Sequence, residues 1–337
     1  MATIKDVARE SGLSIATISK YINGGSVLEP NRLKIERAIS KLGYSVNRAA
    51  RSLKTKRTMT VGVLLPSLDV SFFANIFSEV EALLLKAGYD LIVASFNKDP
   101  KQELKKLQFL VERNVDAIVL VPEGVSRDDI SSISPIVEKK IPLVVIDRYI
   151  ADMQSDFVLV NCRAACNTAV SQFISFGHER IAILLGPNSV YTAADRLSGY
   201  MDALSESGLC VNPEWIKSGE YTVESGYNMM NELMDMPHPP TAVLCTNNEL
   251  TMGAVTAARE RNMTIPDDLS FIGFDDMQLT RIFNPPITIV TQPIHDIAVH
   301  TTQLLLDRLK GDYSDFPRAV HLDASIISCQ SVRTVAQ

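Results

Sequence analysis

Residues 3–23 read TIKDVARESGLSIATISKYIN, a pattern that predicts two short helices joined by a tight turn. Thr3 and Asp6 have the spacing of a capping box at the start of the first helix. Gly12 ends that helix because glycine readily adopts the backbone angles of a sharp turn. Ser14 can cap a second helix, whose expected inner side is Thr17, Ile18, Tyr21 and Ile22. The pattern indicates a helix-turn-helix, although an ordinary helical hairpin would show the same spacing.

Charge is distributed unevenly along the chain and favours the helix-turn-helix. The first 58 residues hold 12 Lys and Arg against 4 Asp and Glu, and the remaining residues hold 21 against 35, out of totals of 33 and 39. A small basic head on a large acidic body is typical of a protein that meets the phosphate backbone of DNA with one end.

The same run, followed by LGYSVNRAARSLKTKRT, closely resembles the headpiece and hinge of the lactose-repressor/galactose-repressor family of bacterial transcription factors. The resemblance extends through the body to about residue 330. It implies a DNA-binding headpiece over 1–44 and a hinge over 45–58, with a hinge helix over about 47–54. An effector-binding and dimerisation domain would follow over 59–330.

By this resemblance the second helix enters the major groove, with Ile15, Ala16 and Lys20 at the base-reading positions. Ile15 and Ala16 can offer apolar contact to a thymine methyl group, and Lys20 can donate to guanine or to a phosphate. Ile15 could instead pack inward. The other implied DNA contacts lie in both the headpiece and the hinge: Thr3, Ser14, Thr17, Ser19, Asn23, Asn47, Ala50, Arg51, Leu53 and Lys54.

A third helix is expected over about 30–42, burying Leu33, Ile35 or Ala38, Ile39 and Leu42. Here the chain departs from the family, which usually places Ser at the position of Leu28 with Pro just after it. Because Pro30 is shifted by one residue, we expect Glu29 to act as a weaker cap.

The segment that follows, residues 45–58, is polar and basic, and its possible helix is too short to be stable alone in water. A plain flexible linker would have the same composition. By resemblance, the hinge folds only when two copies pair in the minor groove, where Leu53 would wedge between base pairs. It would then act as the switch between the body and the operator.

From Met59 onward, apolar runs that look like buried parallel strands alternate with helical stretches. The first series comprises 61–66, 90–95, 116–121 and 142–147, and the second comprises 180–186, 241–246 and 269–274. Two successive series predict two doubly wound α/β subdomains. The resemblance adds that the chain crosses between them near 161, 292 and 323. The expected lobes are therefore 59–161 with 293–323, and 162–291 with 324–330.

Polar and aromatic residues follow the ends of these strands, where ligands bind in open α/β sheets. Separately each has a structural explanation: Phe73 as core, Arg148 as a surface pair, Asn247 and Asp275 as helix caps. Together they resemble the site of the ribose-type periplasmic sugar-binding proteins, which surround a sugar with aromatic rings and paired polar groups. The implied effector-binding residues are Phe72, Phe73, Asp147, Arg148, Thr192, Arg196, Tyr221, Asn247, Asp275 and Gln292.

Several positions depart from that pattern and leave the sugar open. Val70 and Ser71 replace a polar residue and a Pro before the aromatic pair, and Asn248 replaces the usual Asp after Asn247. Val190 stands where relatives that bind anionic or planar ligands can carry Arg. A pentose such as ribose is the first expectation, followed by a hexose or a sugar acid.

The remaining features argue against other classes. No run approaches the roughly 18 apolar residues of a membrane span, and a polar, capped first helix is unlike a signal peptide. The five cysteines lack a CxxC pair, which favours reduced thiols, and Cys162 and Cys166 make a poor metal site without nearby partners. The five histidines are scattered, and we find no nucleophile–base constellation. We therefore expect no catalytic residues, no metal and no cofactor.

We interpret the chain as a transcriptional regulator of a carbohydrate-utilisation operon, most simply a repressor. It would be cytoplasmic, on the bacterial nucleoid when bound, and its partners would be pseudo-palindromic operator DNA, a sugar effector and a second copy of itself. The absence of a leucine-rich heptad tail after Ser328 favours a homodimer over a tetramer. The alternatives are a regulator that answers to a phosphorylated carrier protein, or to a metabolite such as a purine or a sugar acid.

Overall fold

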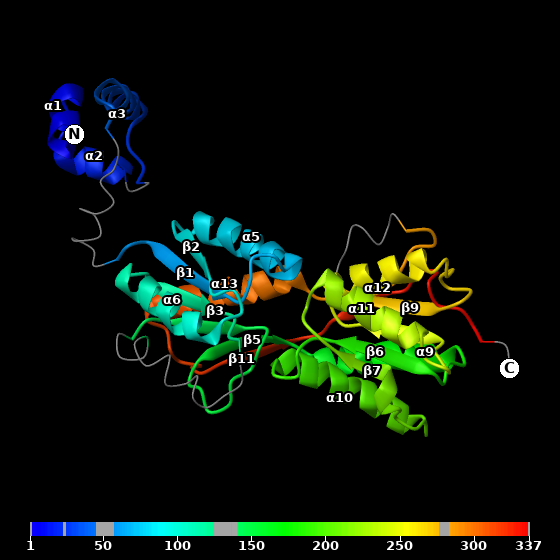
Figure 1. Ribbon diagram of the computed structural model, residues 1–337. Helices are drawn as coiled ribbons and strands as arrows, with labels where there is room; N and C mark the ends of the chain where they lie inside the picture. Colours follow the sequence, from blue (N-terminus) through cyan, green and yellow to red (C-terminus); the bar gives the residue numbers. More distant parts are fainter. Residues whose placement is uncertain are drawn as a thin grey trace. The chain divides into compact units, whose positions relative to one another are not determined.

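The computed structural model describes residues 2–22, 25–44, 57–123, 136, 140–275 and 283–335. The chain divides into two compact units, Met1–Thr58 and Met59–Gln337, shown in Figure 1. In the described parts of both units, no helix is long and apolar enough to cross a membrane.

The first unit is built from three helices, α1 (Ile4–Ser11), α2 (Ile15–Ile22) and α3 (Glu29–Leu42). The predicted capping box is present, with Thr3 and Asp6 exchanging hydrogen bonds at the start of α1. Gly12 then takes the left-handed conformation at φ 67°, and the Ser14 hydroxyl caps α2 by accepting from the Thr17 amide over 3.2 Å. A small core of Val7, Ile18, Ile35 and Ala38 joins the three helices.

The expectations for α3 are wrong at two residues. Leu28 occupies the N-cap position and makes no side-chain capping bond, while Glu29 lies inside the helix and accepts from Arg32 Nε over 3.0 Å. Its carboxylate is therefore used for an ion pair within the helix. Leu33 is 43% exposed, because it lies about 200° around the helix from the buried Ile35, two residues further on.

The first lobe of the second unit has a six-stranded, all-parallel sheet in the order β11-β5-β4-β3-β1-β2. Val63 on β1 faces a core shared with α5 and α13, whereas the next residue, Leu64, faces a core shared with α6. This alternation, buried on both faces, explains why the strand reads as a continuous apolar run. The elements are β1 (Thr60–Leu65), α5 (Ser71–Lys86), β2 (Asp90–Ser95), α6 (Pro100–Glu112), β3 (Ala117–Leu120), β4 (Leu143–Ile146), β5 (Asp156–Val160), α13 (Ile294–Lys310) and β11 (Ala319–Leu322).

The second lobe repeats this plan with the order β12-β10-β9-β8-β6-β7, in which only β12 runs antiparallel to its neighbour. Ile183 packs with α9 and α10 on one face, and Leu184 packs with α11 and α12 on the other. The elements are α9 (Cys162–Ser175), β6 (Ile181–Leu185), α10 (Tyr191–Glu206), η1 (Pro213–Trp215), β7 (Ile216–Ser218), α11 (Val223–Met234), β8 (Ala242–Cys245), α12 (Asn248–Glu260), β9 (Ser270–Phe274), β10 (Thr288–Thr291) and β12 (Ser325–Ile327).

The chain passes between the lobes three times: from β5 to α9, from β10 to α13, and from β11 to β12. As a result α13, late in the sequence, lies beside α5 in the first lobe (Figure 1). Asn161 Nδ2 lies 3.5 Å from Asp323 Oδ1, which links two of the crossings. The expected fold class, an all-α helix-turn-helix headpiece followed by two doubly wound parallel-sheet subdomains, is confirmed.

Candidate functional site

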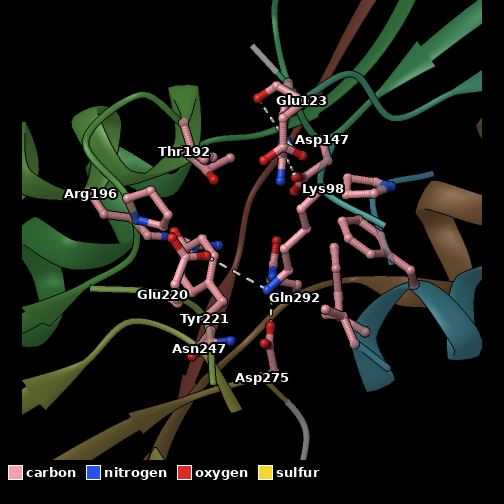
Figure 2. A pocket seen from close by; sticks show the side chains of 17 residues that line it. Lys98, Glu123, Asp147, Thr192, Arg196, Glu220, Tyr221, Asn247, Asp275 and Gln292 are labelled. Carbon is pink, nitrogen blue, oxygen red and sulfur yellow. Dashed lines mark hydrogen bonds and ion pairs between the residues drawn. The ribbon is translucent and has the colours of Figure 1, made fainter. Parts of the chain in front are cut away.

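A cavity lies between the two lobes, at the strand ends that face each other. It holds about 580 Å³ not filled by atoms, open solvent at its mouth included. All ten residues that the sequence assigned to an effector line this cavity, and Figure 2 shows most of their side chains converging on it. Seven further residues complete the lining: Pro66, Val70, Lys98, Glu123, Pro187, Val190 and Glu220.

The apolar wall comes from the first turn of α5. Phe72 and Phe73 are 6% and 5% exposed, and their ring centroids lie 5.4 Å apart at an interplanar angle of 53°. Both rings also belong to the core of the first lobe, so the expectation that Phe73 is core and the expectation that it faces a ligand are compatible. Aromatic faces held in this way suit the apolar face of a sugar ring or a planar base.

Opposite charges are paired within the first lobe. Arg148 is 5% exposed and donates from Nη1 to the Glu123 carbonyl over 3.0 Å. The same guanidinium lies 3.4 Å from the Glu123 carboxylate and 3.5 Å from the Asp147 carboxylate. Asp147 adopts a left-handed φ of 68°, a strained conformation that is typical of residues held in place for binding.

Arg196 projects from α10 of the second lobe and is 4% exposed. Its Nη1 donates to the Thr246 carbonyl over 2.7 Å, and its guanidinium lies 4.4 Å from the centroid of the Phe274 ring. Among the described residues its Nε finds no hydrogen-bond partner. A buried donor without a partner is costly, so a ligand acceptor at this position would be favoured.

Asp275 and Gln292 form the base of the site, at the end of β9 and at the crossing after β10. Asp275 also has a left-handed φ, of 70°, and burial raises the pKa of its carboxyl above the ordinary range. Gln292 Nε2 donates to Asp275, and within the described structure Gln292 Oε1 has no partner. Asn247 is the N-cap of α12, since its Oδ1 accepts from the Leu250 amide over 2.9 Å, so it caps the helix and lines the cavity at once.

Tyr221 is placed against the cavity by a close approach to the chain. A Cβ at Gly186, directly after β6, would overlap the Tyr221 ring. The Tyr221 hydroxyl lies 3.4 Å from Arg196 Nη1, and Thr192 is buried beside it on α10. Gly186 therefore provides space for a ring at the site.

Sequence reasoning missed three charged lining residues, Lys98, Glu123 and Glu220. Lys98 Nζ lies 3.8 Å from the Glu220 carboxylate of the opposite lobe, as the dashed line in Figure 2 marks. Lys98 follows the end of β2 and Glu123 follows β3, so the strand-end rule could have found both. Glu220 follows β7, a three-residue strand with no apolar run to mark it.

In the headpiece, the proposed base-reading residues Ile15, Ala16 and Lys20 are exposed on α2, and Ile15 is 45% exposed rather than packed inward. Thr3 and Ser14 act as helix caps, and the Thr17 hydroxyl lies 2.9 Å from that of Ser14. Ser19 is partly buried. Asn23 and the hinge residues Asn47, Ala50, Arg51, Leu53 and Lys54 lie outside the described residues, as does the hinge helix.

All five cysteines are free: Cys162, Cys166 and Cys245 are buried, and Cys210 and Cys329 are exposed. Within the described residues there is no group of three His, Cys, Asp or Glu that could hold a metal ion.

Comparisons with known proteins agree with this architecture. Residues 3–47 match the family model of bacterial regulatory proteins of the lacI family, and residues 58–311 match that of periplasmic binding proteins and the sugar-binding domain of the LacI family. The chain is similar to the HTH-type transcriptional repressor PurR of Actinobacillus pleuropneumoniae, at 32% identity over 99% of both chains. It is also similar to the ribose operon repressor of Haemophilus influenzae, at 33% identity over 98% of this chain and 99% of the relative.

Solved structures give the same result for the fold. The lac repressor dimer bound to operator and the anti-inducer ONPF matches with a TM-score of 0.86 and 23% identity over 99% of both chains. A LacI-family regulator from Enterococcus faecium with bound ribose matches with a TM-score of 0.74 and 25% identity, over 82% of this chain and 100% of that one. The family model of the body alone covers more than half of the sequence. The chain therefore belongs to the lacI family of bacterial regulatory proteins.

Proposed function

We propose that this protein is a homodimeric repressor of a carbohydrate-utilisation operon in the bacterial cytoplasm, controlled by a small neutral sugar in the cavity between its lobes. Two headpieces would bind half-sites of a pseudo-palindromic operator, with Ile15, Ala16 and Lys20 facing the bases. The relatives described above include a transcriptional repressor and a ribose operon repressor, which supports this class of function.

The main observation in favour of a neutral sugar as the ligand is the pairing of charges inside the cavity. Lys98 pairs with Glu220, and Arg148 pairs with Glu123 and Asp147, so most charge is already compensated within the protein. The lining has four carboxylates against three cations, which disfavours an anionic ligand. What remains is a set of fixed donors and acceptors beside an aromatic pair, an arrangement suited to hydroxyl groups on a ring.

Control of DNA binding would follow from closure of the lobes around the sugar, which changes the separation of the two hinge anchors in a dimer. Moving the protein from almost fully bound to almost fully free requires the sugar to prefer one state by about 10⁴-fold, or about 5.5 kcal/mol. Buried side chains that meet the ligand from both lobes would supply such a preference. Arg148 comes from the first lobe and Arg196 from the second.

A purine is the second candidate, because several similar relatives are HTH-type transcriptional repressors with the name PurR. The Phe72–Phe73 wall would accept a planar base as well as a sugar. Against it, the apolar Val190 lines the cavity at 2% exposure, so that position offers no side-chain hydrogen bond to a base edge.

The test is a thermal-shift screen of the full-length protein against pentoses, hexoses, sugar acids and purines. A ligand at 100 times its Kd adds about 2.7 kcal/mol of stability to the folded state, enough for a clear shift. We expect a shift with D-ribose or another neutral monosaccharide that is lost in Asp275→Ala. A shift with purines alone would show that the effector is a purine and not a sugar. A response only to a phosphorylated carrier protein would show that the regulator answers to a protein partner.

A further inference from the structure

Two helices, one from each lobe, begin next to each other beside the cavity. Helix α5 of the first lobe begins at Ser71, and Val70 at its N-cap position makes no side-chain capping bond. Helix α12 of the second lobe begins at Asn248. Asn248 Nδ2 donates to Ser71 Oγ over 2.7 Å in a partly buried position, joining residues 177 positions apart in the chain. The first residue of each helix therefore contacts the first residue of the other.

A carboxylate close to both helix N-termini favours the contact electrostatically. Helix N-termini carry partial positive charge, so two of them face to face repel each other unless an anion lies nearby. Glu249, the second residue of α12, provides a carboxylate that accepts from Asn247. Burial, together with the repulsion of Asp275, raises the pKa of Glu249, and the Ser71 amide of the other lobe and Lys98 partly oppose this shift. The carboxylate thus faces groups from both lobes.

The contact is adjacent to the ligand walls. Ser71 immediately precedes the aromatic pair of the first lobe, and Asn248 immediately follows Asn247 of the second. Neither Ser71 nor Asn248 lines the cavity. A hydrogen bond between them fixes the aromatic wall of one lobe against the amide wall of the other without occupying the space for a ligand.

We propose that Ser71 and Asn248 form a cross-lobe positioning pair that holds the two lobes closed with Phe72, Phe73 and Asn247 facing one ligand. The pair acts on effector affinity through these walls, and in that respect it rests on the proposed function. The Lys98–Glu220 ion pair also joins the lobes, but its side chains are 33% and 62% exposed and water weakens it. The partly buried Ser71–Asn248 bond is the stronger restraint on closure.

The first experiment measures closure without any ligand. Gln108 is exposed on α6 of the first lobe, and Cys210 is the exposed thiol after α10 of the second. The full-length variant with Gln108→Cys and Cys329→Ser carries one reactive thiol on each lobe for spin labels. Mixing it with an excess of unlabelled chain confines the distance measurement to one protomer. We expect Ser71→Ala and Asn248→Ala each to lengthen or broaden the interlobe distance distribution.

Two variants serve as controls. Asn167 Nδ2 donates to Glu206 between α9 and α10 within the second lobe, so Asn167→Ala removes a similar bond without touching closure. Ser71→Thr keeps the hydroxyl and should retain the wild-type distances. Because both alanine variants break the same bond, the double variant should open no further than either single variant.

The second experiment uses D-ribose as the probe in calorimetric titrations. Loss of one net hydrogen bond from the closed state should weaken binding about two- to tenfold in Asn248→Ala, with Ser71→Thr near wild type. Unchanged interlobe distances in both alanine variants would overturn the positioning pair whether or not D-ribose binds. Changed distances together with no D-ribose binding by the wild type would retain the pair and reject ribose as the effector.

Discussion

Gln292 donates its side-chain amide to Oδ1 of Asp275 over 2.6 Å, and both side chains are buried, at 5% and 6% exposure. Gln292 lies where the chain leaves the second lobe for α13, and Asp275 lies at the end of β9. The hydrogen bond therefore connects a crossing between the lobes to the base of the cavity. A ligand that binds Asp275 would therefore lie next to a residue of that crossing.

Asp275→Asn should stabilise the ligand-free protein at neutral pH while removing sugar binding. Burial raises the pKa of Asp275, so the folded state binds a proton more tightly than the unfolded state. The stability contributed by the protonated form is therefore lost as pH rises from the ordinary value of 3.8 through the raised pKa. Thermal melts across this range should give the variant a higher melting temperature than the wild type at neutral pH. In acid the two melting temperatures should be equal. A variant that melts earlier at neutral pH would contradict this account.

Gly186→Ala should distort the site through Tyr221. The added methyl group would overlap the Tyr221 ring, and overpacking of this kind costs about 1–3 kcal/mol of stability. We expect a lower melting temperature and weaker effector binding. Adding Tyr221→Ala should restore the melting temperature but not the binding, because it frees the space and removes the ring. If Gly186→Ala alone binds normally, the close packing of Tyr221 on Gly186 is not needed at the site.

Lys20→Ala should weaken operator binding by about 1–3 kcal/mol if Lys20 reads a base. Loss of a phosphate contact would instead weaken binding to all sequences and reduce the slope of log affinity against log salt by about 1. Fluorescence anisotropy at several salt concentrations, on an operator selected from a random library, separates the two roles. Arg9→Ala on α1 is a suitable control, because Arg9 lies on the first helix of the motif and pairs with Asp6.

Leu53→Ala should weaken operator binding while leaving the body folded and effector affinity unchanged. Insertion of the Leu53 side chain between base pairs would cost about a few kcal/mol of unstacking. The additional contacts that a bent duplex makes with the protein would offset this cost. The variant should therefore bend the operator less, which a gel-based bending assay or DNA ends labelled for energy transfer would detect. Equal operator affinity in the variant and the wild type would exclude the wedge.

Local patterns in the sequence were sufficient to predict most elements of the fold. The capping box at Thr3 and the turn at Gly12 depend on residues within a few positions of each other, and both are present. Burial on both faces of a strand such as β1 produces an apolar run that needs no tertiary information to recognise. The error at Leu33 arose where two faces of one short helix were both partly apolar, so periodicity alone did not choose between them.

The sequence by itself determined the basic first 58 residues and the two βα series, because these depend on composition and on local apolar runs. It also determined the strand ends at which Asp147, Asn247 and Asp275 lie, because the carboxyl ends of parallel strands meet at one edge of a sheet. Only the tertiary structure decided which side chains of the two lobes contact each other. Lys98 with Glu220, and Ser71 with Asn248, come from separate lobes and share no local signal. Their contacts depend on how the two lobes pack against each other through the three chain crossings. This packing is long-range, so a local sequence pattern does not predict it.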